Sequence, residues 1–190
     1  MNRRKSIALV AMVALLLTFT VSGTIAWLAA STDPVVNVFT PGKADTTLEE
    51  EFSTSAKTKI VIRNKDESTI PVFVRVSVSG YYAKDVDGQR VIVGSWDGLT
   101  NEQINSGWFK GNDGFYYYSQ SIAPDDETSN LLKNGIELTN EGGTYLVVNV
   151  IHQSIQADGT TLVNGVETPV VTAKWGVYVV DGKLSLTAGN

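Results

Sequence analysis

The chain has 190 residues, a formal net charge of −5, no cysteine and a single histidine. An acidic composition does not fit a nucleic-acid-binding protein, whose phosphate contacts need clustered Lys and Arg. The lack of cysteine excludes disulfides, thiolate zinc sites and iron–sulfur clusters, and a single histidine excludes any site built from two imidazoles. A chain of this length is most simply a single domain.

The first thirty residues have the pattern of an export signal. A basic stretch from Arg3 to Lys5 precedes an apolar run from Ile7 to Leu17, and small residues follow through Ala30. This order is typical of a secretory signal peptide, expected here as a helix over residues 1–26. Thr24-Ile25-Ala26 places small residues before the predicted cleavage site, between Ala26 and Trp27, with Ala30 as the second choice.

An uncleaved membrane anchor is the alternative interpretation. Residues 7–30 are long enough to cross a bilayer, although the apolar run thins into Ser, Gly and Thr before a full span. Cleavage would remove three of the 15 basic residues and none of the 20 acidic ones, which changes the net charge from −5 to −8. The mature domain, residues 27–190, contains no second apolar span and is expected to leave the membrane.

Strand patterns dominate the mature chain. Residues 72–78 alternate, with four valines on one face and Arg75 and Ser77 on the other, and residues 58–63 form a second apolar run. Tyr145–His152 is almost continuously apolar, which indicates a central strand buried on both faces. Further strands are expected at 35–39, 90–93, 108–110, 115–118, 170–174 and 176–180.

Turn residues agree with this interpretation. Asp-Gly pairs at 87–88 and 113–114 lie between predicted strands and indicate two hairpins, because these residues tolerate positive φ angles. Short helical turns are expected at 100–103 and 128–133, and the polar stretch 45–57 is expected to be a surface connection. Short strands with frequent turns predict an all-β antiparallel sandwich or barrel.

Several motifs, in this order, resemble those of one family of exported proteins. They are the signal exit at 23–27, Val38-Phe39-Thr40-Pro41-Gly42, the strand–loop–strand block at 60–76, the aromatic block at 108–118 with 124–132, and residues 148–157. The group contains the TasA and camelysin (CalY) proteins of Gram-positive bacteria, whose signals are cut by the SipW type of signal peptidase. The resemblance implies a jelly-roll β-sandwich and, for some members, extracellular biofilm fibres. The chain differs from the fibre-forming members in its aromatic-rich region, residues 96–118.

The residues predict no catalytic group, cofactor or metal site, although some camelysin-like proteins are described as metallopeptidases. His152 stands in a strand pattern without an H-E-x-x-H or G-x-S-x-G motif, so it is interpreted as a sheet-edge or packing residue. The acidic runs 49–51 and 125–127 are interpreted as solvated charge rather than as a hydrolase pair. Asp85-Val86-Asp87-Gly88 is a fragment of a calcium loop that lacks further oxygen ligands.

Aromatic residues form a candidate binding surface. Trp96, Trp108, Tyr116 and Tyr118 lie close together in the sequence, and exposed rings of this kind stack on sugars or bury against another protein. The alternative is ordinary core and cross-strand packing.

The mature N-terminus, residues 27–39, is a candidate donor strand. Val35, Val36, Val38 and Phe39 are apolar and β-prone, and cleavage would free them to pair with the sheet edge of a neighbour. The alternative is that they form the first strand of their own domain.

The leading hypothesis is a secreted, non-enzymatic structural protein of the cell surface or biofilm matrix that assembles by β-strand addition with copies of itself or with related matrix proteins. The alternative is a carbohydrate-binding or adhesive surface module that uses the aromatic residues.

Overall fold

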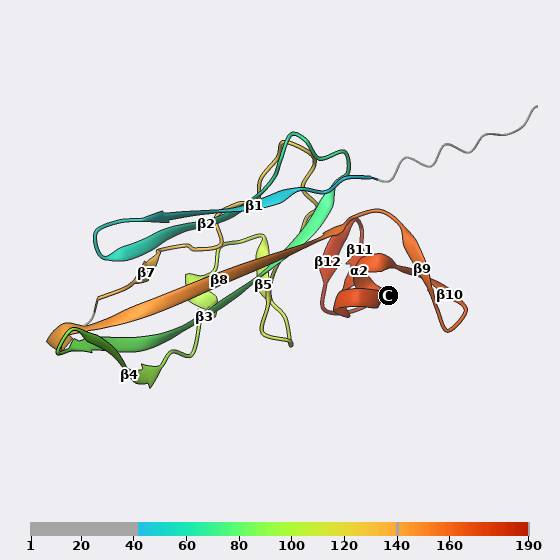
Figure 1. Ribbon diagram of the computed structural model, residues 1–190. Coiled ribbons are helices and arrows are strands. Elements are labelled where there is room, and N and C mark those ends of the chain that lie inside the picture. The colour runs from blue at the N-terminus through green and yellow to red at the C-terminus, as the bar shows by residue number, and fades with distance from the viewer. Residues whose placement is uncertain (1–41, 140, 190) are drawn as a thin grey trace, which may run out of the picture. The chain divides into compact units, whose positions relative to one another are not determined.

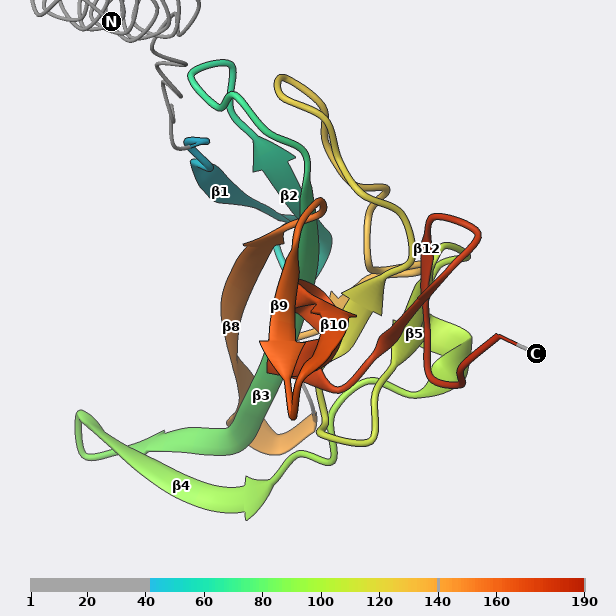
Figure 2. The same ribbon diagram turned by 90° about the vertical axis from the view of Figure 1, so that its right-hand side faces the viewer.

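The computed structural model describes residues 42–139 and 141–189, which lie mostly in antiparallel β-strands (Figures 1 and 2). The all-β prediction is confirmed. Contacts divide the chain into Met1–Thr40 and Pro41–Asn190, and the described residues belong to the second unit. The predicted signal helix, the Ala26/Trp27 cleavage site and the donor strand therefore lie outside the described residues. Within residues 42–139 and 141–189, no helix has the length and apolar character needed to cross a membrane.

The first sheet contains three strands in the order β1–β2–β7, with bounds Thr46–Phe52, Ala56–Asn64 and Ile136–Glu137. β2 confirms the strand predicted at 58–63. β1 shows that the predicted surface connection over 45–57 is wrong, because its polar side chains pair across the strand with the basic residues of β2.

The predicted helical turn at 128–133 is also wrong. This segment runs along β2, where Thr128 N donates to Ile62 O at 2.9 Å and Leu131 N donates to Ile60 O at 2.9 Å. Bonding to a neighbouring strand replaces the local bonds of a helical turn.

The second sheet is built around β3, Val72–Val86, which pairs with β8, Thr144–Gln156, along nearly its whole length. On its other side β3 pairs with β6, Tyr116–Tyr118, and with β4, Gln89–Ser95. β5, Trp108–Lys110, completes the sheet beside β6.

The two sheets pack face to face around the main core (Figure 1). Val72, Val74 and Val76 of β3 are fully buried, and Ile60 and Ile62 of β2 face them from the other sheet. The predicted valine face is thus confirmed, and the arrangement is sandwich-like.

Both predicted hairpins are present. Asp87 and Gly88 join β3 to β4 with φ angles of 52° and 79°, the left-handed conformation that a two-residue turn requires. β5 and β6 pair across the loop that contains Asp113 and Gly114. The predicted turn at 100–103 is the 3₁₀ helix η1, Asn101–Gln103, and a second one, η2, Glu141–Gly143, precedes β8.

β8 is not the central strand that its apolar run predicts. Within the described residues it pairs along its length with β3 alone, and of its side chains only Leu146 is buried. Ile151 is 62% exposed. β3 occupies the centre because it is long enough to pair with different strands on its two sides.

The C-terminal residues cover the outer face of β3. They comprise two hairpins and one short helix: β9 Thr160–Val163, β10 Val166–Pro169, α2 Val170–Trp175, β11 Tyr178–Val180 and β12 Lys183–Ser185. Val171, Val177 and Leu184 form a second buried cluster with Phe73 and Tyr117.

The strand predicted at 170–174 is wrong, because this segment is α2. Val171 buries against the second cluster, and Gly176 ends the helix with a φ of 71° and an N–H bond to Thr172 O. This tertiary contact outweighs the β-preference of Val-Val-Thr. The strand predicted at 176–180 is confirmed in part by β11.

Candidate interaction surfaces

Outer strands of the two sheets are the first candidates for contact with a partner. An outer strand carries backbone N–H and C=O groups without a partner on one side and can template another chain. In the described part of the chain, β1 and β7 are the outer strands of the first sheet, and β4, β5 and β8 are outer strands of the second. β1 and β4 are two outer strands of equal length. Their side chains differ in kind.

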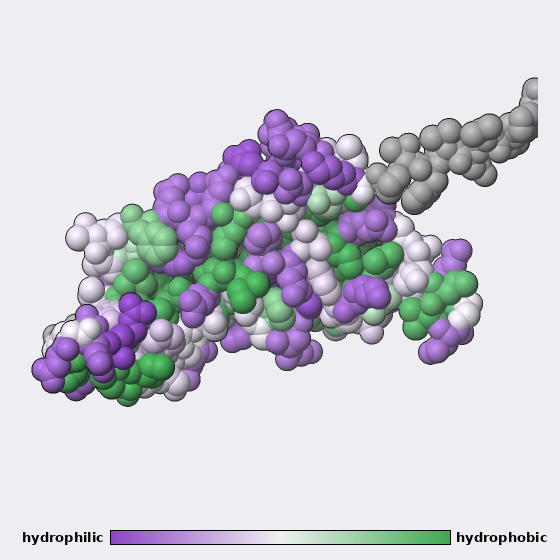
Figure 3. Space-filling model, viewed as in Figure 1, coloured by the Kyte–Doolittle hydropathy of each residue, from purple (hydrophilic) through white to green (hydrophobic). Residues whose placement is uncertain are grey.

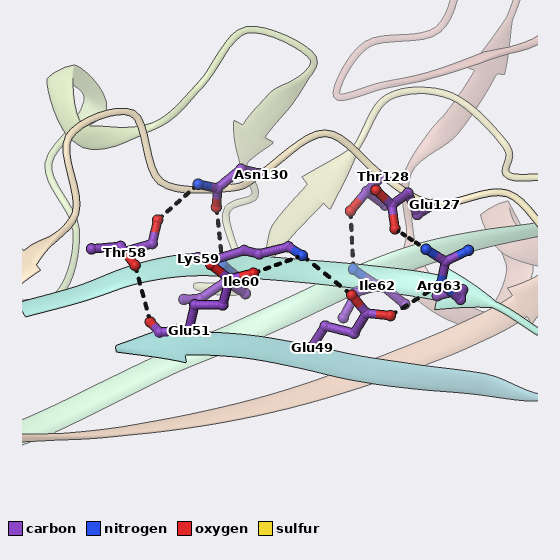
Figure 4. A network of polar contacts seen from close by, with 10 residues as sticks. All are labelled: Glu49, Glu51, Thr58, Lys59, Ile60, Ile62, Arg63, Glu127, Thr128 and Asn130. Atoms are coloured by element: carbon purple, nitrogen blue, oxygen red, sulfur yellow. Dashed lines mark hydrogen bonds and ion pairs between the residues drawn. The ribbon is translucent and has the colours of Figure 1, made fainter. Parts of the chain in front are cut away.

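β1, β2 and the segment that runs beside β2 carry a charged ladder, defined here as Glu49, Glu51, Lys59, Arg63 and Glu127 (Figure 4). Arg63 Nε donates to Glu49 Oε1 at 3.0 Å, and its Nη2 donates to Glu127 at 2.6 Å. Lys59 Nζ lies 3.3 Å from Glu49 and 3.1 Å from Glu51. The bond from Arg63 is the main cause that holds the pKa of Glu49 below its ordinary value.

The two acidic runs are thus ordered by ion pairs, which the prediction of simple solvated charge missed. The signal in the sequence was the alternation of Lys and Arg along 57–63, which matches the acidic residues of 49–51 across an antiparallel pair. Glu50 likewise pairs with the buried Lys57.

β4 carries an apolar edge, defined here as Val91, Ile92 and Val93. Their exposed fractions are 41%, 64% and 46%. Figure 3 shows hydrophobic surface at the end of the domain where β4 lies. The charged residue of β4, Arg90, donates to the Tyr145 hydroxyl, which donates to Asp85. Asp85 of the calcium-loop fragment therefore takes part in a contact that joins the turn end of this hairpin to β8.

A second apolar surface lies at the β9–β10 hairpin. Leu162 is 69% exposed and Val166 is 65% exposed, on either side of the Asn164-Gly165 turn. Figure 1 shows this hairpin beside α2, and Figure 3 shows hydrophobic surface in the same place.

Most of the predicted aromatic surface packs inside the sandwich. Trp108 is 7% exposed and its Nε1 donates to Ser129 O at 2.9 Å. Tyr116 is 1% exposed, and Tyr118 packs against Trp108 with ring centroids 5.2 Å apart. Ordinary core packing describes Trp108 and Tyr116, although the small exposed part of Trp108 also lines a surface pocket of about 420 Å³. Trp96 is half-buried and packs against the same core cluster.

An arginine–aromatic cluster was missed by sequence reasoning. The Arg75 guanidinium lies 4.1 Å from the ring centroid of Phe115 and 4.7 Å from that of Trp175. Its Nη1 donates to Asp113 at 3.0 Å and to the Tyr117 hydroxyl at 2.9 Å.

Burial is the main cause that raises the pKa of Tyr117, and its bond to Asp113 adds to the effect. The cluster joins β3, the β5–β6 loop and α2, which are distant in the sequence. Arg75 on the face opposite the valines was the available signal, but Trp175 could not be linked to it from the sequence.

His152 lies on β8, half-buried, with Nε2 3.1 Å from Thr46 Oγ1 in a hydrogen bond. This contact joins β8 to the start of β1. Across the residues that the structure covers, no group of three or more His, Cys, Asp or Glu side chains is placed to hold a metal ion.

Comparisons with protein-family models, with curated proteins and with solved structures found no significant match to this chain.

Proposed function

We propose that the chain is a secreted, non-enzymatic structural protein of the bacterial cell surface or biofilm matrix, assembled by β-strand addition. The export part of the proposal rests on the sequence: a basic stretch, an apolar run and the small residues around Ala26. The motif resemblance to the TasA and camelysin group supports the same location in a Gram-positive bacterium, processing by a signal peptidase, and a jelly-roll form of the sandwich.

The observation that carries assembly is the apolar edge of β4. Native proteins commonly protect outer strands with charge, and β1 has such charge whereas β4 has three exposed aliphatic residues in a row. An added strand would gain main-chain hydrogen bonds and cover Val91, Ile92 and Val93. β4 is the acceptor that we propose.

The donor that we propose is the N-terminal segment of a neighbouring copy. Val36 and Val38 share one face of an extended segment, and residues 35–39 carry no charge that would have to be buried. Donor and acceptor are different surfaces, so each copy can receive one strand and give another, and repetition produces an open filament.

Electron microscopy of the protein that begins at Trp27 tests this proposal. Filaments are expected for the unaltered protein and for Asn37→Asp, which adds charge to the other face of the donor segment. The double variant Val36→Asp/Val38→Asp is expected to stay monomeric with an unchanged circular dichroism spectrum. If the unaltered protein stays monomeric at high concentration, or if the double variant still forms filaments, strand donation by this segment is wrong.

A second candidate function is a carbohydrate-binding or adhesive module. One observation favours it: Trp96 lines a cavity of about 430 Å³ together with the polar side chains of Gln103, Asn134 and Glu137.

A further inference from the structure

A cavity of about 430 Å³ opens where the two sheets meet, near the start of β8. Its lining comes from both sheets, with Tyr82 on β3, Trp96 after β4, Gln103 on η1, and Asn134 and Glu137 at β7. We name it the Trp96 cavity. Its volume lies within the range of small-molecule sites in proteins.

The apolar part of the lining belongs to the main core. Ile136 is 2% exposed and Leu146 is 5% exposed, and both also line the cavity. Core packing from two sheets therefore fixes this part of its wall, as expected of a preformed site.

The Trp96 ring packs closely against β3 at Gly80, where the lack of a side chain leaves room for the ring. A Cβ atom on Gly80 would lie 3.0 Å from Trp96 Cε3 and 2.5 Å from Val147 O, so any larger residue would displace the ring or the strand. Tyr82 lies two residues further on the same face of β3. Two half-buried aromatic rings thus line one cavity, positioned by the regular backbone of a central strand.

The polar groups of the cavity remain available. In the described residues, the Tyr82 hydroxyl, the Asn134 amide and the Glu137 carboxylate form no hydrogen bond or ion pair. Gln103 uses Oε1 to accept from Thr100 N at 2.9 Å, which leaves its Nε2 donors. These groups offer both donors and acceptors.

The balance of these groups points to a neutral ligand rich in hydroxyls. Three neutral polar side chains accompany one carboxylate, whereas a site for a cation would favour more negative charge around the rings. Aromatic rings pack against the C–H face of a sugar ring, while amides and carboxylates bond its hydroxyls in both directions.

We propose that the Trp96 cavity binds a pyranose unit of a polysaccharide. The site uses Trp96 and Tyr82 for stacking and Asn134, Gln103 and Glu137 for the hydroxyl groups. It is separate from the β4 edge, so an assembled protein would carry one sugar site per copy and attach to polysaccharide at many points. The proposal does not depend on strand donation.

Isothermal titration with chitotriose, maltotriose and cellotriose tests the site. Both the unaltered protein and the Val36→Asp/Val38→Asp variant are titrated separately. The variant is expected to stay monomeric, so the sugar measurement does not depend on whether filaments form. At least one of the three sugars is expected to bind and to change tryptophan fluorescence.

Two variants with a matched control locate the binding. Tyr82→Ala and the exposed Asn134→Ala are expected to weaken binding by about tenfold, because each removes a direct contact. Tyr178→Ala removes an exposed tyrosine of β11 outside the cavity and is expected to leave binding unchanged.

Three results would overturn the proposal. These are the absence of binding by all three sugars, sugar binding that Tyr82→Ala and Asn134→Ala both leave intact, and binding of the cation Nα-acetyl-lysine methylamide in place of the sugars. Because Asn134 is exposed, its variant folds normally and keeps the test decisive even if Tyr82→Ala is unstable.

Discussion

β1 and β4 are seven-residue strands at the ends of their sheets, yet they present opposite surfaces to a partner. β1 faces solvent with the charged ladder, in which Glu49 binds both Lys59 and Arg63. β4 faces solvent with Val91, Ile92 and Val93. The same fold therefore contains one outer strand whose charges oppose association and one outer strand whose exposed aliphatic side chains favour it.

The difference has a direct physical reason. A strand added beside β1 would have to remove water from paired but exposed charges, and the desolvation cost offsets the new backbone bonds. A strand added beside β4 would cover aliphatic side chains and so gain the hydrophobic effect together with those bonds.

The largest expected effect is a difference in the free energy of unfolding between a core residue of β2 and an exposed residue of β4. Ile62→Ala on β2 should lower the free energy of unfolding by about 2–5 kcal/mol, because the side chain is fully buried between the sheets. Ile92→Ala on β4 should change it by less than about 0.5 kcal/mol, because that side chain is exposed. Urea unfolding of both variants measures the contrast, and a large loss for Ile92→Ala would mean that β4 is part of the core.

A charge on β4 should make it resemble β1. Ile92→Lys is expected to reduce filament mass by about tenfold, because a lysine on the edge strand opposes pairing. Leu162→Lys on the β9–β10 hairpin is the control, since Leu162 is similarly exposed but lies away from this edge. Sedimentation of filaments gives the measurement. Loss of filaments in the control alone would move the acceptor to the hairpin.

Removal of charge from β1 should have a smaller, opposite effect. The triple variant Glu49→Thr/Glu51→Thr/Lys59→Thr keeps β-prone residues but loses most of the ladder. Its self-association, followed by light scattering, should increase about severalfold and should persist when Val36 and Val38 are changed to Asp. An unchanged scattering signal would show that charge is not what keeps β1 unpaired.

The smallest expected effect is a pH dependence confined to the ladder. The pKa of Glu49 is lowered in the folded chain, chiefly by its bond from Arg63. Its contribution to stability is therefore present above the ordinary value of 4.5 and is lost as the pH falls through the lowered value. Thermal unfolding from about pH 6 to about pH 3 should show a smaller loss of Tm for Glu49→Gln than for the unaltered protein. Equal losses would contradict this assignment.

Local patterns were sufficient for part of the fold. The valine alternation of 72–78 and the Asp87-Gly88 turn predicted the face of β3 and its hairpin, because both depend on neighbouring residues in one chain segment. Short strand patterns separated by frequent turn residues likewise indicated an all-β chain.

The candidate sites were harder to predict from the sequence than the strands were. Trp96 was recognisable as an aromatic residue of interest, but its cavity also needs Asn134 and Glu137, which lie at β7 of the other sheet and much later in the sequence. The Arg75–Trp175 contact joins residues one hundred positions apart, and nothing in the local sequence of either residue indicates the other.

By itself the sequence determined the strand-rich character, the tight turns and the chemistry available to each face, since these follow from side-chain period and backbone preference over a few residues. Only the tertiary structure decided that β3 rather than β8 is central, that 170–175 is helical, and which outer strand is charged. Each of these depends on free energy gained between distant segments, where pairing and burial outweigh local preference.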